Sequence, residues 1–311
     1  MPVDFEVHYT DGATALKNQW ITAKHEEVRI PNPSGKAIDF ILFDPGRKLL
    51  KKLVFTRSYT ELAAQALRAS NMIDRYDALL ALRDFPLSQK KADLLKCYNK
   101  ETFQLTKGEI IAQLSADNSV ETTQLLLKAI KDPDDKVRLA VLQNVRKVHD
   151  LLREEYEKMI GDSSYLNVEL AIDNLCSSFP LRSNNYLKIT KDETGWRGRN
   201  IRIKWLETAI GNGQTNYIRE LAGYTGESYE FETRINSVNA LKRLNYLDET
   251  VVGSMIRGLT HWNVKIRTAE SDNLKYFYAQ NRYKLLIDRM ADKEQNPAAK
   301  TELDKLRKAP R

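Results

Sequence analysis

The stretch that decides the fold is Asp134-Asp135-Lys136-Val137-Arg138-Leu139-Ala140-Val141-Leu142-Gln143-Asn144-Val145, which follows the turn Asp132-Pro133. Its apolar residues recur at helical spacing, so it predicts the first helix of a two-helix unit. The chain can be laid over itself when this stretch is shifted in steps of 31 to 33 residues. The residues in register with one another are, in chain order, Arg75, Lys107, Arg138, Glu169, Arg202, Arg234 and Arg267.

This repeat extends along most of the chain. Six of the seven positions in register are basic, and the residue seven positions later is apolar in every unit. A fixed period of this length indicates helix pairs that stack on one another. We therefore predict a mainly α protein, a HEAT/ARM-like α-α superhelix or solenoid of about seven helix pairs. Stacking would bury the apolar stripe that one pair leaves open, and the array would curve to give a concave face.

The repeated basic residue has two interpretations. Each member of this ladder can bond a turn or a carboxylate of the neighbouring repeat and so lock the stack, or the cations can line a groove. The first interpretation is the one we favour, and both stay open at this stage. The members of the ladder are Arg75, Lys107, Arg138, Arg202, Arg234 and Arg267.

The N-terminal residues have the pattern of β-strands. Val3, Phe5, Val7 and Tyr9 alternate with polar residues, which predicts a half-buried strand. Further strands are predicted at 19–30, 37–43 and 49–55, and turn sequences separate them. Four strands are few for an independent sandwich. We therefore predict a small, incomplete β-sandwich at 1–56, the helical array at 57–293 and a charged C-terminal tail at 294–311.

Charge and composition narrow the class of protein. The chain has 311 residues, with 49 Lys and Arg against 42 Asp and Glu, a net charge of +7. The basic excess is spread along the chain, which suits a solvated helical surface and argues against a nucleic-acid interface. No apolar run is long enough for a membrane helix, and the start lacks the pattern of a signal peptide. Because the chain enters a strand directly, we expect it to be part of a longer protein, and its compartment stays open.

The sequence contains none of the common zinc, nucleophile or phosphate-binding motifs in complete form. His25-Glu26-Glu27-Val28-Arg29 has the first half of an HExxH zinc motif, but arginine stands where the second histidine is needed. No nucleophile elbow and no phosphate-binding glycine loop occurs. Cys97 and Cys176 lie among apolar residues, which favours reduced core thiols over a disulfide or a reactive site. We predict a non-catalytic chain with no cofactor or metal of its own.

One loop is a candidate contact site. Residues 196–205 form the stretch richest in both basic and aromatic residues. Arg202 and Trp205 fall on positions expected to be structural. The remaining side chains, Trp196, Arg197 and Arg199, are candidates for contact with a ligand or partner.

The junction between sheet and helices resembles a known family. Phe40-Ile41-Leu42-Phe43-Asp44-Pro45-Gly46-Arg47-Lys48-Leu49-Leu50-Lys51-Lys52-Leu53 is similar to the end of the β-sandwich in M1-family zinc aminopeptidases, an apolar strand followed by F-D-x-G/N-x-x-L-L-x-x-L. Asp74-Arg75-Tyr76-Asp77-Ala78-Leu79-Leu80-Ala81-Leu82 is similar to the D-R-x-x-A-x-x-A-L opening of that family's helical domain. The family's zinc ligands and catalytic residues belong to a preceding domain and have no counterpart here.

The resemblance implies a role and leaves alternatives. As a C-terminal region of an M1-like enzyme, the chain would brace its own upstream catalytic domain and limit which peptides reach the zinc held there. The alternative is a stand-alone HEAT-like scaffold that binds a protein or peptide on its concave face. A third reading, a helical-repeat nucleic-acid binder, would require binding with a steep salt dependence.

Overall fold

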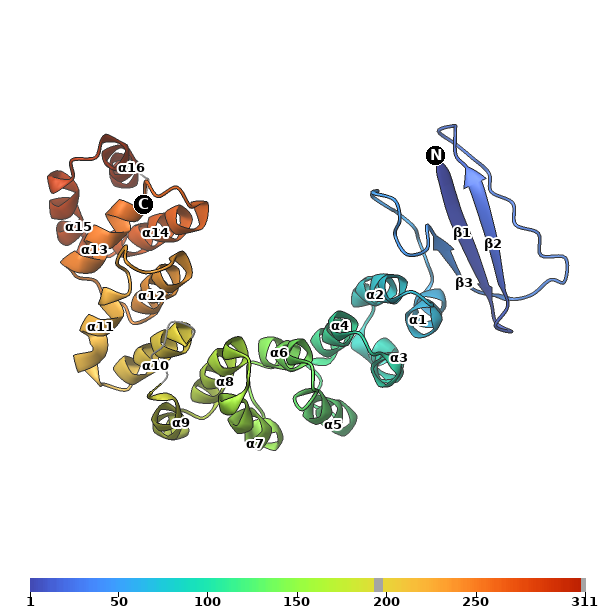
Figure 1. Cartoon of the computed structure of the whole chain (residues 1–311), viewed down its shortest axis with the longest axis horizontal. Helices are drawn as coiled ribbons and strands as arrows, with labels where there is room; N and C mark the ends of the chain where they lie inside the picture. Colours follow the sequence, from blue (N-terminus) through green and yellow to red (C-terminus); the bar gives the residue numbers. More distant parts are fainter. Residues whose placement is uncertain (193–197, 309–311) are drawn as a thin grey trace. The chain divides into compact units, whose positions relative to one another are not determined.

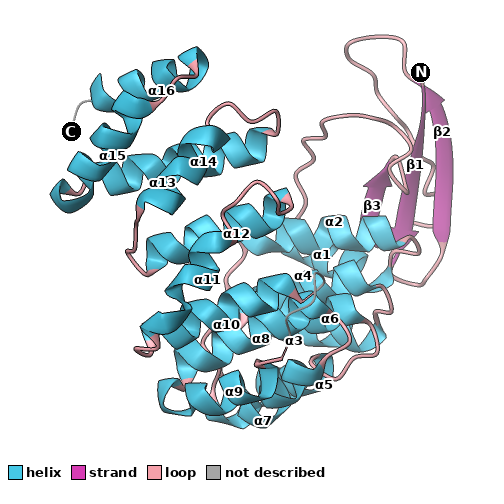
Figure 2. Cartoon of the chain, turned by 60° about the vertical axis from the view of Figure 1, so that its left-hand side comes forward, coloured by secondary structure: helices cyan, strands magenta, loops and turns pink. Residues whose placement is uncertain are grey.

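The computed structural model describes residues 1–192 and 198–308 of the chain. Its contacts divide the chain into two compact units, Met1–Glu155 and Tyr156–Arg311, which we call unit 1 and unit 2. Strands occur in the N-terminal part, and helices follow it (Figures 1 and 2). None of the described helices combines the length and the apolar character that crossing a membrane requires.

Unit 1 begins with a three-stranded antiparallel sheet and continues as helices. Its strands are β1 (Pro2–Tyr9), β2 (Thr14–Trp20) and β3 (Ile38–Phe43), in the spatial order β2-β1-β3. Its helices are α1 (Tyr59–Arg68), α2 (Met72–Ala81), the 3-10 turn η1 (Leu82–Asp84), α3 (Leu87–Lys100), α4 (Gln104–Leu114), α5 (Val120–Ala129) and α6 (Asp135–Asn144). Helix α7 (Asp150–Lys158) contains the division between the units.

The regular secondary structure in the described residues of unit 2 is entirely helical. Its elements are η2 (Met159–Gly161), α8 (Tyr165–Ser178), η3 (Pro180–Arg182), α9 (Ser183–Thr190), α10 (Arg199–Gly211), η4 (Thr215–Tyr217), α11 (Ile218–Gly223), α12 (Phe231–Arg243), α13 (Glu249–Gly258), α14 (Val264–Tyr278), α15 (Asn281–Lys293) and α16 (Pro297–Lys308). Helix α16 buries Ala299 and Leu303 in the unit's hydrophobic core, so the charged C-terminal segment is packed there as a helix.

The first helices of successive repeats pack side by side within each unit. In unit 1, α4 contacts both α2 and α6. In unit 2, α10 lies between α8 and α12, and α12 also contacts α14. Each of these helices begins a few residues before one of the seven positions in register, which is Glu169 in α8 and a member of the ladder in the others. The prediction of a mainly α, HEAT-like array of helix pairs with a small β part is therefore confirmed.

Two of the predicted strands are wrong. The second strand is Thr14–Trp20 rather than 19–30, because it pairs with β1 across the turn that contains Gly12, at a φ of +85°. In the following segment the Glu26 carboxylate accepts the N–H groups of Thr22 and Ala23, both at 2.9 Å, which removes them from any ladder. The predicted strand at 49–55 pairs with no other strand of the described chain.

Helix α1 fastens the sheet to the helices. It begins with a capping box, in which the Ser58 side chain and the Glu61 side chain each bond the other's backbone N–H. Its Ala64, together with Ala69 just beyond the helix, packs against Phe40 and Leu42 of β3. Arg68 adds a two-point ion pair to Asp39, at 2.7 and 2.5 Å. One face of β3 is therefore covered, and its neighbourhood holds the site described next.

Candidate functional site

The residues 44–57, which we call the junction loop, connect β3 to α1 through a tight turn. Asp44 and Arg47 take φ values of +55° and +52°, and Gly46 takes +76°. The left-handed region is costly for residues with a side chain, although aspartate tolerates it. Such a turn persists only where its surroundings hold it in place.

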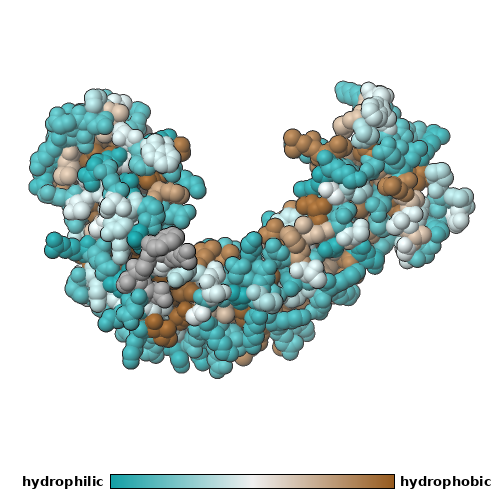
Figure 3. Space-filling view, viewed as in Figure 1, coloured by the Kyte–Doolittle hydropathy of each residue, from teal (hydrophilic) through white to brown (hydrophobic). Residues whose placement is uncertain are grey.

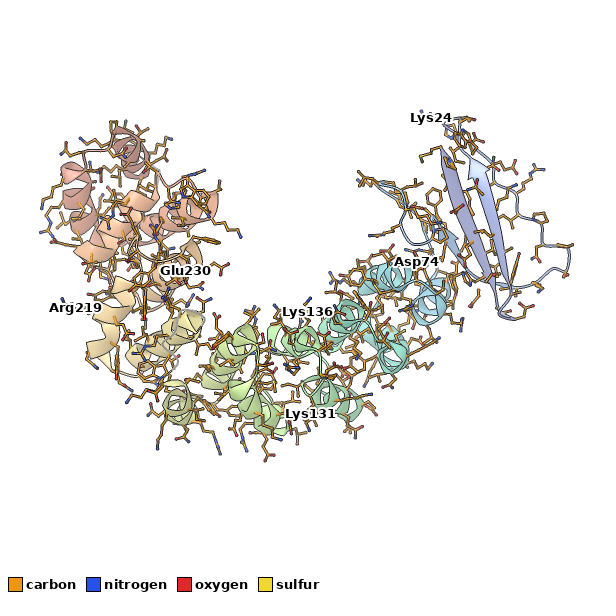
Figure 4. The ribbon with its side chains drawn as sticks, in the orientation of Figure 1. Lys24, Asp74, Lys131, Lys136, Arg219 and Glu230 are labelled. Atoms are coloured by element: carbon orange, nitrogen blue, oxygen red, sulfur yellow. The ribbon has the colours of Figure 1, made fainter. Side chains whose placement is uncertain are left out.

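Two buried carboxylates hold this turn. The Asp44 carboxylate accepts the N–H groups of Lys48 at 3.2 Å and Leu49 at 2.9 Å, and it also contacts the Lys51 ammonium. Asp74, labelled on α2 in Figure 4, accepts the N–H of Gly46 with both oxygens at 3.0 Å. Burial opposes ionisation of Asp44, but the Lys51 ammonium and these N–H groups outweigh it and lower its pKa.

A cleft of about 710 Å³ opens beside this turn. It is lined by β3, the junction loop, α1 and α2. The loop borders the cleft with both charged and apolar side chains. Several of the apolar ones are exposed to solvent, and Figure 3 shows hydrophobic surface on this loop. The exposed apolar residues of the loop are Leu50, Leu53, Val54 and Phe55.

The backbone of the same segment is also unpaired. Asp44 binds the N–H groups as far as Leu49, but residues 50–57 make no backbone hydrogen bond with the described part of the chain. Arg57 donates to the side chain of Gln65 at 2.7 Å, while its buried Nε finds no acceptor in the described structure. The segment therefore combines exposed apolar side chains with open hydrogen-bonding groups.

Three of the ladder residues are bonded to the turn that precedes their own helix. Arg75 donates from Nη1 to the carbonyls of Ala69 and Ser70, at 3.0 and 2.9 Å. The corresponding bonds of Arg138 go to Asp132 and Pro133, at 2.8 and 2.9 Å. Those of Arg267 go to His261 and Trp262, at 2.6 and 2.9 Å. In all three repeats the acceptors lie five and six residues earlier, so the guanidinium group closes the turn before its own helix.

Three ladder residues also reach a later carboxylate. Arg75 forms a two-point ion pair with Glu101 at 2.8 and 3.0 Å, and Arg202 does the same with Glu220 at 2.8 Å for both bonds. Lys107 contacts Asp132 at 2.7 Å. Arg202 also lies over the Trp205 ring, 4.4 Å from its centroid.

Arg234 differs from the other members of the ladder. It is 2% exposed, and its Nε and Nη2 have no hydrogen-bond partner in the described structure. Glu270 of α14 is 0% exposed, and both of its carboxylate oxygens likewise lack one. Burial raises the pKa of Glu270 to about 7, and the charge of Arg234 opposes that rise. The core of unit 2 thus holds a titratable carboxyl group.

The structure describes one of the three loop candidates, Arg199. Trp196 and Arg197 lie outside the described residues. Arg199 begins α10 and donates to Glu230, labelled in Figure 4, at 2.6 Å. Its guanidinium group also lies over the Tyr229 ring, 5.0 Å from the centroid. Arg199 therefore connects α10 to the turn before α12, and its contact with a ligand stays a prediction.

Within residues 1–192 and 198–308, no group of three or more His, Cys, Asp or Glu side chains is placed to hold a metal ion. Cys97 is buried, Cys176 is partly buried, and both are free thiols. Burial raises the pKa of Cys97 to about 12.

Comparison with known proteins shows similarity in structure but not in sequence. No protein-family model and no curated protein matches the sequence. Among solved structures, the chain is similar to the crystal structure of Kap121p bound to Ste12p, with a TM-score of 0.47 and 12% sequence identity. The match covers 78% of this chain and 32% of that one, so the chain spans about a third of its length.

Proposed function

We propose that this chain is a non-catalytic helical-repeat scaffold that docks onto another protein domain through its junction loop. The observation that supports this most directly is the run 50–55, where Leu50, Leu53, Val54 and Phe55 are exposed and the backbone is unpaired. Full burial of one such side chain is worth roughly 1.5–3 kcal/mol. Grouped apolar side chains at the surface are a mark of interaction sites.

The charges around the loop add to this surface. Lys52 is exposed, and Arg47 and Lys48 are exposed but form ion pairs with Asp77 and Asp4. The carboxylates of Asp44 and Asp74 are buried and bonded within the turn. Lys52 therefore places an accessible positive charge within the apolar run. A partner surface with apolar side chains and a rim of carboxylates would complement it.

The experiment is site-specific photocrosslinking of the full chain in its host cells. A photoreactive phenylalanine analogue at Leu50 should yield a discrete crosslinked polypeptide, and the analogue at the exposed Lys136 of α6 should not. The identified partner is then purified and titrated with the chain. Leu50→Asp with Val54→Asp should weaken binding by at least about 10-fold, because polar groups replace buried apolar ones. Equal binding by this double variant would overturn the proposal.

A second candidate names the partner. The residues that resemble the M1-family junction hold one turn in this structure, because Asp44 accepts the N–H of Leu49 and Asp74 accepts the N–H of Gly46. That observation favours a role as the C-terminal region of an M1-like aminopeptidase. The docked partner would then be a catalytic domain that holds zinc and acts on peptides.

Zinc content and hydrolysis distinguish the two candidates. The isolated chain is assayed for bound zinc and for turnover of aminoacyl-arylamides, and we expect neither. A partner with stoichiometric zinc and peptidase activity would support the second candidate. A partner without zinc and peptidase activity would support only the general scaffold role. Zinc-dependent turnover by the isolated chain would refute both candidates.

A further inference from the structure

The edge strand β3 of the sheet in unit 1 has backbone groups that can pair with another strand. Asp44 donates its N–H to the Asp4 carbonyl of β1 at 2.8 Å. In an antiparallel ladder the direction of the backbone groups alternates from residue to residue. The N–H and C=O groups of Ile41 and Phe43 therefore point away from β1, and no other strand of the described chain lies beyond β3.

This edge borders the same cleft as the exposed run of the junction loop. Ile41 and Phe43 line the cleft from β3, and Leu50, Leu53 and Phe55 line it from the loop. Both borders carry backbone groups without protein partners. Unpaired backbone groups that become buried cost free energy unless a partner supplies hydrogen bonds. An apolar surface alone would not meet this need, whereas an extended chain would.

We propose that the cleft receives one extended segment of the docking partner, which pairs with β3 as a fourth strand. This inference rests on the proposed docking function and specifies its mode, strand addition, in which main-chain bonds supply affinity and alternate side chains supply specificity. The strand would run for about six residues, the usual strand length. It would carry apolar residues toward Leu50 and Phe55 and a carboxylate toward the exposed Lys52.

The first test uses a tethered peptide and the full chain. A Lys52→Cys variant is joined through its exposed thiol to a hexapeptide of alternating glutamate and valine. Burial raises the pKa values of both native thiols and slows their reaction. Hydrogen exchange of the Ile41 and Phe43 amides should slow by at least about 5-fold, as expected for a new hydrogen bond of about 1 kcal/mol. Leu42, on the side of β1, is the internal reference.

N-methylated peptides make this test specific for strand pairing. One form is methylated at the glutamates and the other at the valines, and both keep their side chains. Only the form whose free N–H groups face β3 should protect Ile41 and Phe43. No protection by the unmethylated peptide, or equal protection by both methylated forms, would overturn the inference.

The second test examines the natural partner identified by crosslinking. Ile41→Pro removes an N–H that β1 does not use, and proline is tolerated at sheet edges in that orientation. The matched Ile41→Val variant keeps the N–H. The proline variant should bind the partner at least about 10-fold more weakly than the valine variant. Equal binding by these two, with weak binding by the Leu50 and Val54 double variant, would refute strand addition and leave docking intact.

Discussion

Replacement of Glu270 by glutamine should stabilise unit 2 above neutral pH. The carboxyl group is fully buried, and burial raises its pKa from 4.5 to about 7. A pKa above the unfolded value means that the folded chain holds this proton more tightly. The resulting stability is complete below the unfolded pKa and is lost as the pH rises through about 7. Glutamine has the shape of the protonated form and does not ionise.

The magnitude follows from the difference between the two pKa values. Each pH unit of difference corresponds to about 1.4 kcal/mol, so the interval from 4.5 to about 7 corresponds to about 3 kcal/mol. At about pH 8 the Glu270→Gln variant should therefore exceed the parent chain by about 3 kcal/mol in free energy of unfolding. At about pH 5 the difference should shrink below about 1 kcal/mol.

Denaturant unfolding followed by circular dichroism at the two pH values measures this difference. Other titrating groups are common to both proteins and cancel in the comparison. Glu232→Gln, on an exposed position of α12, is the control and should stay within about 0.5 kcal/mol of the parent at both pH values. The opposite sign at high pH, a destabilised Glu270→Gln variant, would show that attraction to Arg234 outweighs desolvation and would refute the reasoning.

Two further substitutions test packing and the ladder. Gly258→Ala places a Cβ 2.4 Å from Cγ of Glu270. This overpacking should destabilise unit 2 by roughly 1–3 kcal/mol, although alanine has the better helix propensity. A lower Tm would show the loss. Arg202→Lys removes the two-point bond to Glu220 and should lower the free energy of unfolding by about 1 kcal/mol. The control Arg219→Lys, at an exposed position, should leave the free energy of unfolding unchanged. The same denaturant titration measures both variants.

The helical part could be predicted because local pattern and packing agree. The stretch from Asp134 predicts a helix that the structure places at Asp135–Asn144, with Asp134 as its N-cap. The strands were harder to predict because a strand exists only with a partner. Residues 49–55 have strand composition but no neighbour in the described chain, whereas Thr14–Trp20 has the poorer composition and the partner.

The candidate sites could be predicted only in part, because exposure and burial also depend on tertiary packing. The junction residues around Asp44 stand out in the sequence as a family-like motif, but their exposure and the cleft beside them depend on tertiary packing. Glu270 gave no signal at all. It reads as a polar position on the surface of α14, and only the packing of α12, α13 and α14 buries it against the backbone of Gly258.

The ladder and the junction loop differ in how many hydrogen-bonding groups remain available to a partner. In Arg75, Arg138 and Arg267 the guanidinium donors are bonded to turns of the same chain, so a ligand would have to displace those bonds. In residues 50–57 the backbone groups are open, and apolar side chains stand beside them. A partner gains both hydrogen bonds and apolar burial at the loop without displacing a bond within the chain. The strongest case for binding is therefore at the end of the sheet, in the junction loop.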